Sequence, residues 1–279
     1  MIRLAVRCRP ELAERVLAEL VELAPGGVEE TSGSEWVEYA VYGVPGELPA
    51  LPGIQAAVGE GVADISTSEI PDDWADRWQD FHQPVLVGGR LWVRPSWEAP
   101  REGAIDVVVD PGRAFGTGAH ATTRMCLELL LGLAEAGRVA GPIADWGTGS
   151  GVLAIAAAKL GFEPVLACDQ EPAALEAASQ NAAANGVEID LRRVDLRERA
   201  APAAPTAIAN LTAPILGEVA ERLDSAPDRL ICSGLTEDEV DGTRAAFARR
   251  HLAPRQTLVR SGWVAMLLAA EQTGDEAPA

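Results

Sequence analysis

A glycine-rich turn between an apolar strand and a helix constrains this chain more than any other feature of its sequence. Residues 145–151 read Asp-Trp-Gly-Thr-Gly-Ser-Gly, at the end of a predicted strand over residues 143–146 and before a helical pattern that begins near Val152. Glycine permits a sharp turn and lets the backbone approach a ligand closely. The N–H groups at the start of a helix attract an anion. These residues therefore predict an α/β unit with a ligand site at the turn.

The C-terminal two-thirds of the chain alternates between apolar strands and helical segments. Such alternation is typical of a parallel sheet with crossover helices. The predicted strands cover residues 143–146, 165–169, 189–194, 206–210, 230–233 and 263–268. We therefore expect a doubly wound, mostly parallel sheet in a domain over residues 101–272, and a frayed polar tail over residues 273–279.

The glycine spacing separates this turn from two other nucleotide-binding motifs. A dinucleotide fingerprint reads G-x-G-x-x-G, but the chain has Val152 where the last glycine would fall. A Walker loop needs Gly-Lys-Ser/Thr, and the only lysine, Lys159, lies beyond the turn. Asp145 before the first glycine is more typical of methyltransferases than of dehydrogenases, and it can also brace the turn. We expect S-adenosylmethionine here, bound by Asp145, Gly147 and Gly149.

Polar side chains end three further predicted strands, and we expect them at the same edge of the sheet. Asp169, about 20 residues after the turn, can accept both hydroxyl hydrogens of a ribose, whereas Glu171 is better interpreted as a first-turn acid of the next helix. Asp195 can reach the adenine amino group, or it can be a helix N-cap. Asn210 can orient an incoming amine or bind the amino group of the cofactor, and it is the candidate catalytic residue.

The residues after Asn210 indicate the kind of acceptor. The Asn-Pro-Pro-Tyr tetrapeptide, common in methyltransferases that act on planar amide or ring nitrogens, is absent, because Leu211-Thr212-Ala213 follows. An aliphatic amine has a free lone pair and is therefore the favoured acceptor. Because no strong general base is evident, we expect water to take its proton.

A glycine-rich loop over residues 110–123 precedes the predicted parallel sheet. Phe115 in this loop can stack near the sulfonium cation of the cofactor. Thr122 or Thr123 can bond the cofactor, or simply cap the helix that follows. His120 is a less favoured candidate base, because a lone histidine in a loop is more often not catalytic. Phe115 and one of these two threonines are therefore candidates for the cofactor site.

The first 70 residues predict a small α+β domain. Strands are expected near residues 2–8, 28–31, 36–42 and 62–70, with one helix over residues 10–23 and a second, broken by Pro49 and Pro52, before the last strand. This β-α-β-β-α-β order predicts a ferredoxin-like sandwich. Residues 71–100 predict a linker made of a helix, with Trp74, Trp78 and Phe81 on one face, and a hairpin.

Composition excludes several classes of protein. The formal net charge is −19, which is unsuited to direct nucleic-acid binding and suited to a basic protein partner or simply to solubility. No apolar stretch is long enough to span a membrane, and the N-terminus does not resemble a signal peptide. The four cysteines lie far apart, so we expect no metal site and a reducing, cytoplasmic environment.

These stretches together resemble the PrmA family, the methyltransferases of ribosomal protein L-eleven (L11). The most specific likeness is the loop Asp110-Pro111-Gly112-x-Ala114-Phe115-Gly116-Thr117-Gly118-x-His120-x-Thr122-Thr123, supported by residues 73–82 and 91–97, the glycine turn and Ala209-Asn210-Leu211. The chain departs from the usual family pattern at Trp146, at Gln170-Glu171 and at Leu211.

The resemblance implies a Rossmann-like class I methyltransferase domain that uses S-adenosylmethionine. It assigns cofactor contacts to Thr123, Gly147, Asp169 and Asn210. It also implies methylation of lysine side chains and the N-terminal amine of L11, with the small N-terminal domain recognising this substrate. We expect a monomer. The alternative is a methyltransferase of the same fold that acts on another protein lysine or on a small-molecule amine.

Overall fold

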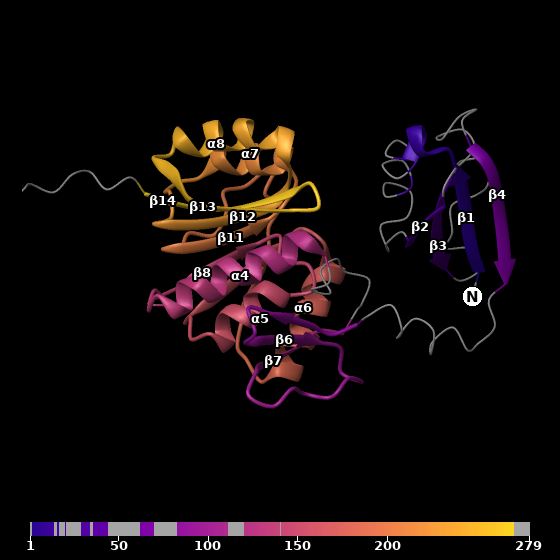
Figure 1. Cartoon of the computed structure of the whole chain (residues 1–279). Coiled ribbons are helices and arrows are strands. Elements are labelled where there is room, and N and C mark those ends of the chain that lie inside the picture. Colours follow the sequence, from indigo (N-terminus) through magenta and orange to yellow (C-terminus); the bar gives the residue numbers. More distant parts are fainter. Residues whose placement is uncertain are drawn as a thin grey trace, which may run out of the picture. The chain divides into compact units, whose positions relative to one another are not determined.

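The chain divides into two compact units, residues 1–81 and 82–279 (Figure 1). The computed structural model describes residues 2–13, 16, 20, 29–33, 36–43, 62–69, 83–110, 120–139 and 141–270. Each unit has its own sheet and its own apolar core. Trp74, Trp78 and Phe81 of the predicted linker helix, and the predicted second helix of the N-terminal domain, lie outside the described residues.

The first unit contains a four-stranded antiparallel sheet. Its strands are β1 (Ile2–Cys8), β2 (Glu29–Ser32), β3 (Val37–Gly43) and β4 (Val62–Glu69), in the order β2-β3-β1-β4. Alternate residues of β1, including Leu4 and Val6, face the core, as the period of two in a strand requires. With β1 paired to β3 on one side and to β4 on the other, this strand order fits the predicted ferredoxin-like sandwich, whose predicted helices lie mostly outside the described residues.

The second unit is built on a seven-stranded sheet. Its strands are β8 (Ile143–Trp146), β9 (Val165–Asp169), β10 (Asp190–Arg193), β11 (Thr206–Asn210), β12 (Arg229–Thr236), β13 (Leu252–Arg260) and β14 (Trp263–Ala270). They lie in the order β10-β9-β8-β11-β12-β14-β13. The first five are parallel, and β14 runs antiparallel to both β12 and β13. The predicted doubly wound, mostly parallel sheet is confirmed.

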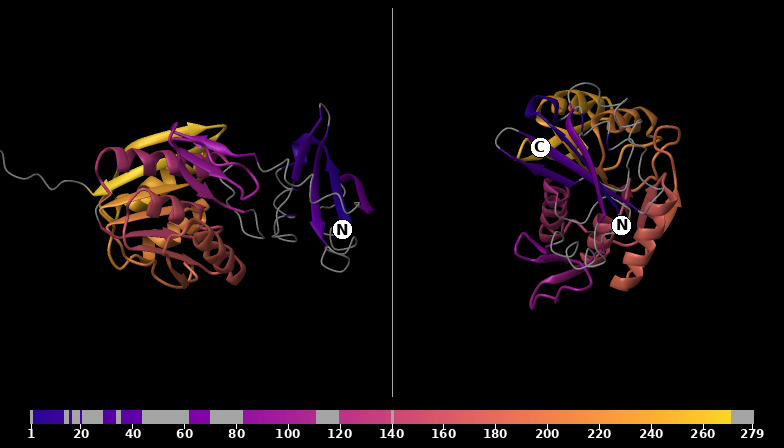
Figure 2. Two further views of the ribbon diagram at one scale, coloured as in Figure 1. Left: turned by 90° about the horizontal axis from the view of Figure 1, so that it is seen from below. Right: turned by 90° about the vertical axis from the view of Figure 1, so that its right-hand side faces the viewer.

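Helices cover both faces of this sheet (Figure 2). They are α4 (Ala121–Glu135), α5 (Val152–Lys159), α6 (Pro172–Asn185), α7 (Ala213–Arg222) and α8 (Val240–Ala248). In β8, Ile143 packs in the core that contains α4 and α5, whereas Ala144 and Trp146 pack in the core that contains α7. Apart from Asp145, the residues of β8 are apolar, as expected of a strand that is buried on both faces.

A second, three-stranded sheet packs into the same unit. It consists of β5 (Val85–Val87), β6 (Leu91–Arg94) and β7 (Ile105–Val108), with β5 antiparallel and β7 parallel to β6. Val87 and Val107 belong to the core that also contains α4 and α5. Residues 83–100, which the sequence pattern placed in a connecting segment, are therefore part of the second unit.

Strand β13 was not predicted. It lies at the edge of the sheet, most of its side chains are exposed, and a register irregularity follows Pro254. Proline and polar residues at an edge strand prevent further pairing, and they also interrupt the apolar periodicity by which a strand is predicted.

Within the described residues, no helix combines the length and the apolar character that crossing a bilayer would need.

Candidate active site

The predicted site residues that the structure describes gather at the edge where the parallel strands end. The glycine turn follows β8, Asp169 ends β9 and Asn210 ends β11. Strands β8 and β11 are neighbours, although β9 and β10 lie between them in the sequence. The order in which strands are added to the sheet therefore reverses between β8 and β11, and ligands of open α/β sheets bind at such a switch point.

The glycine turn depends on backbone conformations that favour glycine. Gly147, Gly149 and Gly151 have φ angles of +76°, +54° and +84°. The turn is held against the next strand, because the N–H groups of Gly147 and Thr148 both donate to the carbonyl oxygen of Cys168 at 2.9 Å. A side chain with a Cβ would be strained at each glycine, so this part of the sequence specifies its local structure closely.

Asp145 lies beneath the turn and is only 1% exposed. Its Oδ2 accepts hydrogen bonds from the Thr148 hydroxyl at 2.7 Å and from the N–H of Ala154 in α5 at 3.2 Å. Burial raises the pKa of this carboxyl to about 7, although both hydrogen bonds favour the charged form. Asp145 therefore braces the turn, which is one of the two roles predicted for it. A direct contact with the cofactor stays a prediction.

Asp169 joins β9 to the glycine turn. Its Oδ2 accepts the N–H of Gly149 at 3.0 Å, and its Oδ1 accepts the N–H of Glu171, the residue that precedes α6, also at 3.0 Å. The carboxylate is half-exposed at the ligand edge of the sheet. It is thus held rigidly while its remaining lone pairs can accept hydrogen bonds from a diol, which fits the predicted ribose contact.

Asn210 and Thr123 come together at the end of β11, although 87 residues separate them in the sequence. The amide nitrogen of Asn210 donates to the Thr123 hydroxyl at 3.3 Å. Thr123 is 1% exposed and lies in the first turn of α4. Because the nitrogen is engaged with Thr123, the amide oxygen of Asn210 is the group that can accept a hydrogen bond from an amine.

Leu211, the residue after Asn210, is packed between two glycines. A Cβ on Gly147 would lie 3.3 Å from Leu211 Cγ and closer still to Cδ2. A Cβ on Gly234 of β12, which has a φ of +89°, would lie 2.8 Å from the Leu211 carbonyl carbon and 3.1 Å from its nitrogen. The register of β12 shifts around Gly234, as in a β-bulge. Leu211 and Gly234 were not predicted as site residues.

His120, rather than Thr122 or Thr123, is the N-cap of α4. Its Nδ1 accepts the N–H of Thr122 at 3.4 Å and lies 2.7 Å from the hydroxyl of the same residue. The ring meets Trp263 edge to face, with centroids 5.1 Å apart. Burial lowers the pKa of His120, so the imidazole is neutral near pH 7. These contacts give His120 a structural role at the start of α4, and none of them requires it to act as a base.

The predicted cofactor contacts of Asp195 and Phe115 are not tested by the structure. Asp195 lies just beyond the end of β10, where its Oδ1 accepts the N–H of Arg197 at 2.9 Å, an arrangement that caps a local turn. A contact between Asp195 and adenine stays a prediction. Phe115 lies outside the described residues, so its predicted stacking on the sulfonium stays a prediction as well.

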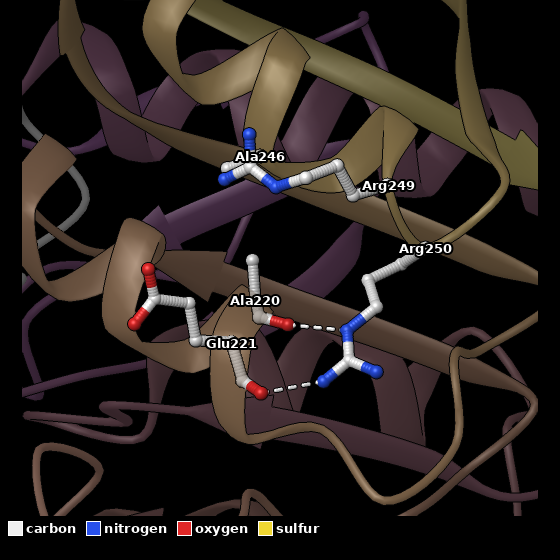
Figure 3. A pocket seen from close by; sticks show the side chains of 5 residues that line it. All are labelled: Ala220, Glu221, Ala246, Arg249 and Arg250. Carbon is white, nitrogen blue, oxygen red and sulfur yellow. Dashed lines mark hydrogen bonds between the residues drawn. The ribbon is translucent and has the colours of Figure 1, made fainter.

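A depression between α7 and α8 lies away from this edge (Figure 3). Both helices begin at the ligand edge of the sheet and end at the opposite one, where Arg249, Arg250 and Glu221 line the depression. Arg250 donates to the carbonyl oxygens of Ala220 at 2.5 Å and Glu221 at 2.6 Å. It thereby satisfies carbonyl groups at the end of α7, which is a structural role.

Comparison with known proteins identifies the family. The family described as ribosomal protein L11 methyltransferase (PrmA) matches residues 55–271, which is most of the chain. The chain belongs to the PrmA family. PrmA proteins are methyltransferases, and S-adenosylmethionine is the cofactor, as the glycine turn predicted. The residues described above fit this cofactor, since a fixed carboxylate and a glycine turn meet at the switch point.

Individual relatives match over most of their own length. A ribosomal protein L11 methyltransferase of Symbiobacterium thermophilum is 36% identical, covering 89% of this chain and 84% of the relative. One from Pelotomaculum thermopropionicum is 34% identical, covering 95% and 97%. The crystal structure of ribosomal protein L11 methylase from Lactobacillus delbrueckii subsp. bulgaricus is 30% identical, with a TM-score of 0.61, and covers 68% of this chain and all of that one.

Proposed function

We propose that this PrmA protein transfers methyl groups from S-adenosylmethionine to lysine side chains of ribosomal protein L11, and to its N-terminal amine. The observation that carries the proposal is the likeness, over 95% of this chain, to a relative named as a ribosomal protein L11 methyltransferase. We assign recognition of the substrate to residues 1–70 within the first unit, and methyl transfer to residues 101–272. The net charge of −19 favours a basic protein over a nucleic acid as partner.

The chemistry requires little from the enzyme beyond orientation and desolvation. The bound cofactor supplies a methyl group that is already activated by the sulfonium. Holding nucleophile and methyl carbon in line can contribute roughly 7–11 kcal/mol. The amide oxygen of Asn210 orients the amine, while Thr123 fixes the amide nitrogen at 3.3 Å. The Asn210–Thr123 pair thus sets the direction from which the amine approaches.

The acceptor lysine must lose a proton before it can react. Its free pKa is about 10.4, and desolvation beside a cation lowers this value. We assign the proton to water, because the neutral imidazole of His120 is engaged in capping α4. A ribosomal substrate places the reaction in the cytoplasm, and the proposed form of the enzyme is a monomer.

Transfer of labelled methyl groups to a panel of acceptors tests this function. The panel contains unmethylated L11, other basic proteins of similar size and free alkylamines. We expect label in L11 at a rate far above the other acceptors. Equal labelling of the whole panel would contradict the proposed substrate and favour a less selective amine methyltransferase of the same fold.

A further inference from the structure

Two buried asparagines lie one helical turn apart on α6, among alanines. Asn181 is 5% exposed and Asn185 is 9% exposed. Asparagine is mostly found at protein surfaces, and burying its amide is unfavourable unless hydrogen bonds replace those to water. The partners of these two amides therefore account for their presence in the helix.

Both asparagines pair with the edge of β7 that does not face β6. The Oδ1 of Asn185 accepts the N–H of Val108 at 2.9 Å, and its Nδ2 donates to the carbonyl oxygen of Val108 at 2.6 Å. The Oδ1 of Asn181 accepts the N–H of Asp110 at 3.1 Å. The spacings match, since four helical residues rise about 6 Å and two strand residues about 6.6 Å.

Asn181 makes one contact that Asn185 does not. Its Nδ2 donates to the carbonyl oxygen of Ser150 at 2.9 Å. Ser150 belongs to the glycine turn and is 1% exposed. One buried amide therefore holds both the cofactor turn and Asp110, the residue from which the chain continues toward the predicted Phe115 contact.

We propose that Asn181 is a positioning residue for cofactor binding, which fixes the glycine turn relative to the end of β7. Asn185 serves the fold alone, because its bonds reach only β7 and its own helix. The inference rests on the proposed function only in taking S-adenosylmethionine as the ligand of the turn. It does not depend on the identity of the methyl acceptor.

The substitutions Asn181→Asp and Asn185→Asp form a matched pair. In Asn181→Asp, one oxygen still accepts the N–H of Asp110, but the other replaces the donor and repels the carbonyl oxygen of Ser150. In Asn185→Asp, the donor to Val108 and to the carbonyl oxygen of Asn181, at 2.8 Å, is lost. The second change removes two hydrogen bonds of the fold, so it should lower the melting temperature at least as much as the first.

Calorimetry of the full chain with S-adenosylhomocysteine gives the deciding comparison. We expect Asn181→Asp to weaken binding about tenfold or more, as for other losses of a buried hydrogen bond. Asn185→Asp should stay within about threefold of the wild-type protein, because no hydrogen bond of the Asn185 side chain reaches the glycine turn. A merely structural role would make affinity follow melting temperature in both variants.

Equal losses of affinity in the two variants, or unchanged affinity in Asn181→Asp, would overturn the proposal. If either aspartate variant does not fold, Asn181→Ala and Asn185→Ala provide the same comparison without an added charge. Methyl transfer to L11 by the wild-type protein is measured separately. A failure of the proposed substrate therefore leaves the binding comparison intact.

Discussion

Replacing Gly234 with alanine should slow methyl transfer by moving Leu211 and with it Asn210. The new Cβ would lie 2.8 Å from the Leu211 carbonyl carbon, whereas ordinary contact begins at 3.4 Å, so the backbone must shift by at least 0.6 Å. A misplacement of about 1 Å can cost about 100-fold in rate. We therefore expect the rate constant at saturating substrates to fall about 10- to 100-fold.

Gly161→Ala is the matched control for this substitution. Gly161 has a φ of +99°, close to the +89° of Gly234, but a Cβ there would meet no atom within 4 Å. Both variants should lose about 1–2 kcal/mol of stability from the left-handed backbone. Single-turnover kinetics measure the rate of methyl transfer, and urea unfolding measures the loss of stability, so the two effects of each substitution can be separated. If Gly234→Ala kept the rate of Gly161→Ala, the packing of Leu211 would not position Asn210, and the reasoning would be refuted.

Three other substitutions test the described contacts. Asp169→Asn should raise the dissociation constant of S-adenosylmethionine about tenfold or more by calorimetry, because the side chain loses its charge and one of the two backbone N–H groups loses its acceptor; unchanged affinity would remove Asp169 from the site. Thr123→Val should lower kcat roughly fivefold by releasing the amide of Asn210, and combining it with Asn210→Ala should add little further loss. The Asp145 carboxyl has a folded pKa of about 7, above its ordinary 3.8, so its stabilising effect is present below pH 3.8 and is lost as the pH rises through 7. The difference in unfolding free energy between wild type and Asp145→Asn should therefore fall over this interval, and a constant difference would contradict the raised pKa.

The sequence predicted the inner parallel strands well because they are buried on both faces. The predicted bounds of β8, β9 and β11 agree with the structure residue for residue. Strand β13 was missed, because an edge strand with exposed side chains and a proline has no apolar periodicity. The other edge strand, β10, was predicted although its side chains are mostly exposed, so it is the proline and the polar residues of β13 that account for the miss.

Candidate site residues could be predicted where the local sequence leaves few roles open to a residue. The glycines between a strand and a helix, and the carboxylate at the end of the next strand, are two such cases. Asn181, Leu211 and Gly234 were missed, because their roles come from contacts between segments far apart in the sequence. A signal existed for Asn181, since asparagines four residues apart in an alanine-rich helix mark one polar stripe that must find partners.

The most direct test of the central claim is the intact mass of unmethylated L11 after incubation with this protein and S-adenosylmethionine. Peptide mapping then locates each added group. The account predicts methyl-sized increments on lysine side chains and the N-terminal amine with the wild-type chain, and strongly reduced increments with Asn210→Ala. An unchanged mass of L11 with a wild-type chain that binds the cofactor would contradict the proposed function.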